Sequence, residues 1–130
     1  MKETAGDFKL KRSFSNAFRG FCWVFKTEWN FRIHLAICTI AVMLGLSLEI
    51  SLFEWLALIL CSALVIVSEV LNTALEYLAD AVHPEVNRRV GRSKDVAAAG
   101  VMIAAVAAFV VGAIVFLPKI WDWLTKLIEN

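Results

Sequence analysis

Four polar side chains recur at helical spacing at the end of a long apolar stretch: Glu69, Asn72, Glu76 and Asp80. At about 100° per residue, they fall within an arc of roughly 80° on one face of a helix. Charged groups near hydrocarbon cost at least roughly 2.5 kcal/mol each, so such a stripe needs partners such as a metal, a cation, a proton or a substrate. We therefore expect chemistry at a membrane.

The composition also favours a membrane protein. Of 130 residues, 60% are hydrophobic and 19% are charged, and the mean hydropathy is +0.71. An ordinary small soluble domain is less apolar. The net charge of +1 gives no argument for nucleic acid as a partner. Cys22, Cys38 and Cys61 form no CxxC pair, so we interpret them as reduced core residues.

Three apolar segments can cross a bilayer within one membrane domain covering residues 1–130, and we expect transmembrane helices at 33–48, 52–78 and 96–117. The third has 22 uncharged residues, close to the roughly 20 that a crossing needs. The first is short and needs either an extension through Phe31 or a locally thin bilayer. The sequence therefore predicts an all-α membrane fold.

The basic residues predict the orientation. Eleven of the 13 Lys and Arg residues lie in residues 1–32 and in the expected loop 82–95, whereas the turn at 49–54 has none. By the positive-inside rule, the N-terminus and the 82–95 loop are cytoplasmic, and the C-terminus is outside. We expect no signal peptide, because the first twenty residues are polar and basic.

Two flanking segments are expected at the membrane surfaces. In residues 8–30, aromatic side chains such as Phe14 and Phe18 recur every three or four residues among basic ones, which favours an amphipathic helix in the cytoplasmic interface. A soluble helix packed on a protein core is the alternative. The tail 119–130 carries Trp121 and Trp123, which are typical of an outer interface anchor.

Further charged residues could join the stripe if the surface helix folds back beside the second span. The full candidate set is Glu28, Glu69, Asn72, Glu76, Asp80, Lys94 and Asp95. Oxygen ligands of this kind suit Mg²⁺, and a lysine supplies a point charge for phosphate oxygens. The set therefore suggests metal–nucleotide chemistry. No Walker-type phosphate loop or protein-kinase glycine loop is present, so another architecture would hold the nucleotide.

At these residues the chain resembles the small three-helix bacterial lipid kinases, which comprise diacylglycerol kinase and undecaprenol kinase. The likeness covers roughly residues 10–117. Its elements are the pattern E-x-x-N-T-A-x-E-x-x-x-D from Glu69 to Asp80, the segment from Gly91 through Lys94 and Asp95, the small residues at 97–100, Gly20, and the segment from Glu28 to Arg32.

The resemblance implies an ATP-dependent lipid kinase in the bacterial inner membrane. It implies that Glu28 and Glu76 hold Mg²⁺ with the nucleotide phosphates. Asp80, Lys94 and Asp95 would position the nucleotide, Asn72 would orient these groups, and Glu69 would be the base facing the lipid hydroxyl. A partly desolvated carboxylate suits that last role. The resemblance also implies a homotrimer with active sites at subunit boundaries.

The lipid and two rival classes of protein remain open at this point. Ile33 and His34 stand where the diacylglycerol kinase branch tends to have two polar residues, which favours undecaprenol over diacylglycerol. Arg32 and His34 are expected to face the lipid, although His34 could equally be a satisfied histidine at a helix start. A small ion-conducting oligomer or a noncatalytic membrane subunit would also have three spans with buried carboxylates. Lys94 beside the stripe favours the kinase.

Overall fold

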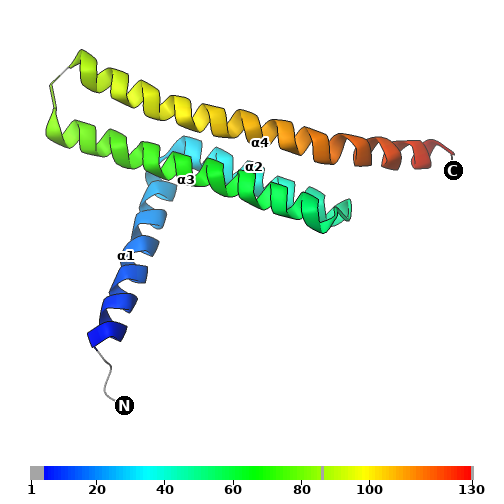
Figure 1. Ribbon diagram of the computed structural model, residues 1–130, viewed down its shortest axis with the longest axis horizontal. Helices are drawn as coiled ribbons and strands as arrows, with labels where there is room; N and C mark the ends of the chain where they lie inside the picture. Colours follow the sequence, from blue (N-terminus) through cyan, green and yellow to red (C-terminus); the bar gives the residue numbers. More distant parts are fainter. Residues whose placement is uncertain (1–4, 86, 130) are drawn as a thin grey trace.

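The structure, a computed structural model, describes residues 5–85 and 87–129, and all the secondary structure in these residues is α-helical. In chain order the helices are α1 (Ala5–Thr27), α2 (Trp29–Ser47), α3 (Leu52–Val82) and α4 (Arg88–Glu129). Helices α2, α3 and α4 lie alongside one another, and α1 leaves this bundle at a steep angle (Figure 1). Lys2, Val86 and Asn130, which belong to segments discussed above, lie outside the described residues.

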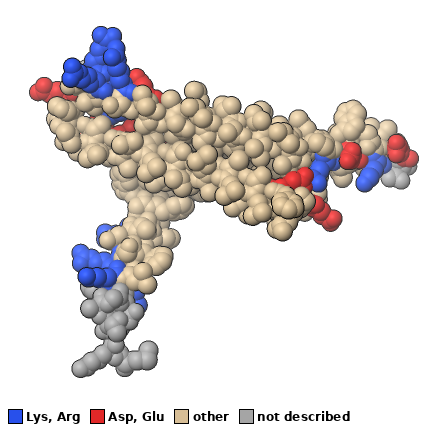
Figure 2. All heavy atoms as spheres, in the orientation of Figure 1, with Lys and Arg blue, Asp and Glu red and all other residues tan. Residues whose placement is uncertain are grey.

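Three of the helices, α2, α3 and α4, are long and apolar enough to cross a membrane. Because α2 begins at Trp29, it has 19 residues and a length of about 28 Å, close to the hydrocarbon thickness of about 30 Å. The first span is therefore longer than the expected 33–48. On the face shown in Figure 2, the charged side chains gather towards the ends of the bundle and on α1, and the middle of the bundle is covered by uncharged residues.

Local signals set the ends of the helices. The Ser51 hydroxyl and the Glu54 carboxylate form a reciprocal capping box at the start of α3. A single extended residue, Glu28, separates α1 from α2 and is the N-cap of α2. At the start of α4, the side-chain oxygen of Asn87 accepts a hydrogen bond from the Arg89 N–H at 2.9 Å.

The connection between α3 and α4 is shorter than expected. The sequence suggested a loop over 82–95, but only residues 83–87 separate the two helices, and 88–95 belong to α4. The expected outer tail 119–130 is helical over its described residues, since α4 continues through Pro118 to Glu129. The candidate residues Lys94 and Asp95 therefore project from a helix rather than from a loop.

The tightest packing lies near the α2–α3 turn. Ile50, Leu58, Val115 and Phe116 form a buried cluster there. Gly45 allows this approach, because a Cβ atom at that position would lie 2.9 Å from the Trp55 ring.

Candidate active site

Two polar residues are buried on α3. Glu69 and Thr73 each expose only 3% of their surface, and they lie one turn apart on the helix. Glu69 interacts electrostatically with Glu28, Glu76 and His34, so the structure brings together charged groups from α2, α3 and the residue that precedes α2. The buried carboxylate of Glu69 is the centre of the candidate site.

A hydrogen bond joins two members of the stripe. The Asn72 amide Nδ2 donates to Glu76 Oε1 at 2.9 Å. The other amide atom, Oδ1, is buried and has no hydrogen-bond partner among the described residues. A buried polar atom without a partner calls for a ligand, an ion or water. The arrangement therefore offers one carboxylate and one free acceptor oxygen side by side.

A second pair lies further along the stripe. Lys94 Nζ on α4 donates a hydrogen bond to Asp80 Oδ1 on α3. Asp80 follows Glu76 by one turn, so the pair is adjacent to the first group. Asp95 is exposed beside Lys94, and no hydrogen bond or ion pair in the described chain links it to the other candidates.

Aromatic contacts fix the junction of α1 and α2 against α3. The ring of Trp23 on α1 meets that of Tyr77 on α3 edge-on, with centroids 4.4 Å apart. The Arg32 guanidinium lies over the Trp29 ring, 4.9 Å from its centroid, and Arg32 Nε is buried without a hydrogen-bond partner in the described residues. Cation–π contact of this kind holds a guanidinium without neutralising it. Arg32 therefore keeps donor capacity for a ligand.

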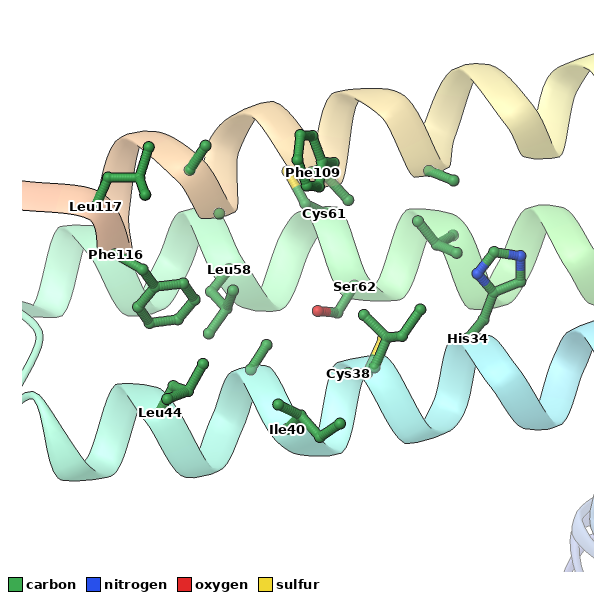
Figure 3. A pocket seen from close by; sticks show the side chains of 17 residues that line it. His34, Cys38, Ile40, Leu44, Leu58, Cys61, Ser62, Phe109, Phe116 and Leu117 are labelled. Atoms are coloured by element: carbon green, nitrogen blue, oxygen red, sulfur yellow. The ribbon is translucent and has the colours of Figure 1, made fainter. Parts of the chain in front are cut away.

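An apolar groove of about 440 Å³ runs along α2, α3 and α4. His34 lies at one end of the groove, and Leu44 and Phe116 lie at the other (Figure 3). Cys38 and Cys61 line it. All three cysteines are free, as expected, and they are half-buried. Val65 lines the groove on α3, and Glu69 follows it by one helical turn, so the buried carboxylate lies just beyond the lining of the groove.

Comparison with known proteins identifies the family of the chain. The family model for prokaryotic diacylglycerol kinase matches residues 15–116. The chain belongs to this family. An undecaprenol kinase of Bacillus subtilis (strain 168) is 33% identical over 109 residues, which are 84% of this chain and 89% of the relative. A diacylglycerol kinase of Synechocystis is 35% identical over 109 residues, 83% of this chain and 62% of the relative. The diacylglycerol kinase of Escherichia coli K12 is 27% identical over 107 residues, 82% and 88% of the two chains.

Membership in the prokaryotic diacylglycerol kinase family confirms the expected activity. The protein is a membrane-located lipid kinase, a phosphotransferase that takes a phosphoryl group from ATP and transfers it to a lipid hydroxyl. This result decides against an ion-conducting or noncatalytic oligomer. It leaves the lipid open, because the relatives include both undecaprenol and diacylglycerol kinases.

The donor atoms fit magnesium, the metal that kinase chemistry implies. Within the described residues, no group of three or more His, Cys, Asp and Glu side chains is arranged to hold a metal. Mg²⁺ in kinases commonly takes only one or two protein carboxylates and completes its shell with phosphate oxygens and water. Glu76, with the unpartnered Asn72 oxygen beside it, offers such a partial shell.

Sequence reasoning did not single out Thr73 or Trp29 as site residues. Thr73 is four residues after Glu69, so helical spacing alone could have placed it beside the buried carboxylate. Trp29 carries no comparable signal, because its contact with Arg32 depends on how the chain turns at Glu28.

Proposed function

We propose that the protein transfers the γ-phosphoryl group of ATP to the hydroxyl of undecaprenol in a magnesium-dependent reaction. Diacylglycerol is the alternative acceptor. One observation carries the proposal: the buried carboxylate of Glu69 lies one helical turn beyond Val65, which lines the apolar groove, and it interacts electrostatically with His34, Glu28 and Glu76. An apolar chain in the groove would bring a terminal hydroxyl to a carboxylate beside the phosphate site.

Glu69 is the proposed general base. As the lipid oxygen bonds to the γ-phosphorus, its proton passes to the Glu69 carboxylate and the bond to the ADP oxygen breaks. Burial of the carboxylate supports this role, because it keeps bulk water away from the group and holds it at one place beside the acceptor hydroxyl. The enzyme otherwise contributes position and charge neutralisation, which are the main demands of phosphoryl transfer.

Glu28 and Glu76 are the proposed magnesium ligands, and Asn72 orients Glu76 through the bond described above. When bound, the metal supplies positive charge to the phosphate oxygens during transfer. Lys94 would bind phosphate oxygens as a point charge, with Asp80 and Asp95 positioning the rest of the nucleotide. The Asp80–Lys94 ion pair supports a preset direction for the lysine.

The groove is the proposed site of the lipid chain. Its lining is almost entirely apolar, and its volume is within the range of ligand cavities. Arg32 and His34 would lie at the polar end, facing the hydroxyl and the phosphate that it receives. The buried, unpartnered Arg32 Nε supports this placement.

The proposed assembly is a homotrimer in the bacterial inner membrane with its nucleotide site in the cytoplasm. Four basic residues at the start of α4 support a cytoplasmic α3–α4 connection, namely Arg88, Arg89, Arg92 and Lys94. Exposed Phe14 and Phe18 and the steep departure of α1 from the bundle support a helix lying in the cytoplasmic interface. Exposure of Asp95 leaves room for a second subunit at the site.

Purified protein supplied with ATP, Mg²⁺ and a panel of polyprenols and diacylglycerols tests the proposal directly. We expect phosphorylated undecaprenol as the main product and loss of turnover when Mg²⁺ is chelated. Glu76→Gln keeps the side-chain size but removes the charge, so its turnover should collapse while the protein remains folded. Wild-type turnover in Glu76→Gln would contradict the metal assignment, and a panel with no phosphorylated polyprenol would contradict the choice of lipid.

A further inference from the structure

The last eleven described residues of α4 form a segment with its own pattern. At about 100° per residue, their apolar side chains fall within an arc of roughly 160° and their polar side chains fill the opposite side. The apolar members are Ile120, Trp121, Trp123, Leu124, Leu127 and Ile128. The family match ends at residue 116, so this segment lies beyond the part of the chain that matches the kinase family.

An ion pair marks the level at which α4 leaves the apolar part of the bundle. Lys119 Nζ on α4 lies 3.3 Å from Glu54 Oε2, which belongs to the capping box at the start of α3. Two charged side chains at this level indicate the boundary of the hydrocarbon, since charges avoid its interior. Phe53, exposed in the first turn of α3, and Trp121, just beyond the pair, are the aromatic residues typical of such a boundary.

A straight α4 would carry the segment too far from the membrane. At 1.5 Å per residue, residues 119–129 extend about 16 Å beyond the ion pair, whereas the headgroup layer is only about 5–8 Å thick on each side. Leu127 and Ile128, which expose 63% and 83% of their surface, would then stand in water. Such an arrangement exposes an apolar face without a cover.

Pro118 provides a place for the helix to bend. Proline has no N–H, so the hydrogen bond from residue 118 to the carbonyl of Ile114 is missing at the point where α4 leaves the hydrocarbon. A bend here costs little further hydrogen bonding, so the segment beyond Pro118 can tilt into the membrane surface.

We infer that residues 119–129 lie in the membrane–water interface on the face opposite the α3–α4 connection. Ile120 packs against the buried cluster at that end of the bundle, and the apolar side chains beyond it lie against lipid. The partner is the lipid surface itself. The polar arc carries Lys119, Asp122, Lys126 and Glu129, whose formal charges sum to zero, so binding rests on apolar burial rather than on anionic headgroups. The segment therefore anchors α4 at the membrane surface opposite the candidate active site, and it sets how deeply α4 lies in the bilayer.

Nitroxide labelling of the full-length protein in lipid vesicles tests this inference. Cys22, Cys38 and Cys61 are replaced, and single cysteines are introduced at two pairs of adjacent positions. One pair is Leu124→Cys and Thr125→Cys, and the other is Ile128→Cys and Glu129→Cys. Adjacent positions share the same depth along the helix but lie on opposite arcs, so each pair contains its own control.

The expected result is a several-fold higher ratio of oxygen to nickel-chelate accessibility at 124 and 128 than at 125 and 129, because oxygen concentrates in lipid and the chelate stays in water. Equal access of the nickel chelate to both arcs would overturn the inference, since the segment would then stand in water. Protection of 124 and 128 from both reagents would overturn it too, since protein and not lipid would then cover the arc. Neither result depends on kinase activity, so the inference fails independently of the proposed function.

Discussion

Lys94 on α4 donates a hydrogen bond to Asp80 on α3. This ion pair links the two helices beside their short connection, at the end of the bundle that holds the candidate site. The two side chains expose 30% and 65% of their surfaces, so solvent screens the attraction. Pairs of this kind contribute about 0–1 kcal/mol to stability. A large effect of either residue on turnover would therefore reflect contact with the nucleotide.

Exchanging the two charges separates a structural role from a nucleotide role. We expect Asp80→Lys combined with Lys94→Asp to fold with a nearly unchanged Tm, because the pair can still form. Its KM for ATP should rise strongly, because the cation no longer lies where the phosphates need it. Lys119→Gln, which removes another α3–α4 ion pair at the opposite end, serves as the control and should keep the wild-type KM. Restoration of normal ATP kinetics by the exchange would limit the pair to a structural role.

Replacing the proposed base should affect chemistry more than binding. Glu69→Gln keeps the buried shape but cannot accept a proton, so we expect kcat to fall by about 10² to 10⁴. Binding of the magnesium–nucleotide complex, measured by calorimetry, should stay near normal. Thr73→Val, at the other buried polar position of α3, is the matched control for disturbing this face. If binding and rate fall together in proportion, Glu69 holds the metal or the fold instead.

Much of the fold could be predicted from the sequence because membrane helices depend on long apolar runs. The order of a leading helix and three long apolar helices agrees with the structure. The expected loop at 82–95 does not agree with the structure. Residues 88–95 are mostly polar and show no apolar period, but they form the first turns of α4, which a capping residue can start. That cap is Asn87, a residue type strongly favoured at helix starts, so the signal was present in the sequence.

The site was less predictable than the helices. Helical spacing alone places Glu69, Asn72 and Glu76 on one face, and the Asn72–Glu76 bond follows from their separation of four residues. Contacts between helices depend on tertiary packing instead. Neither the Asp80–Lys94 pair nor the approach of His34 to Glu69 follows from spacing, because both depend on how α2, α3 and α4 pack together.

Filling the groove should impair lipid use. Ala108 lines the groove on α4, and its neighbour Ala107 is exposed and does not. We expect Ala108→Leu to lower kcat/KM for the lipid roughly tenfold, which corresponds to about 1.4 kcal/mol of lost complementarity. The KM for ATP should stay unchanged. Ala107→Leu adds the same volume to the same helix and should behave like wild type. Equal effects of both variants would place the lipid chain elsewhere.

The orientation can be measured at the α3–α4 connection. Arg89 is exposed near the start of α4, so Arg89→Cys in a background without the native cysteines gives an accessible thiol. We expect a membrane-impermeant maleimide to label this thiol in inside-out vesicles and not in intact cells. The basic residues around it predict this result. Labelling from outside would place the nucleotide site on the wrong side of the membrane, since ATP is cytoplasmic.

The choice of lipid should depend on the start of α2. Diacylglycerol brings two ester groups that need hydrogen-bond partners at the interface, whereas a polyprenol is apolar up to its hydroxyl. Ile33 offers no such partner, and His34 offers one at the mouth of the groove. We therefore expect a higher kcat/KM for undecaprenol than for diacylglycerol, measured by competition between the two lipids in one assay. Ile33→Gln combined with His34→Gln should narrow the gap, because two amides can then bond the esters. A preference of the unaltered protein for diacylglycerol would refute the undecaprenol assignment and leave the lipid kinase activity standing.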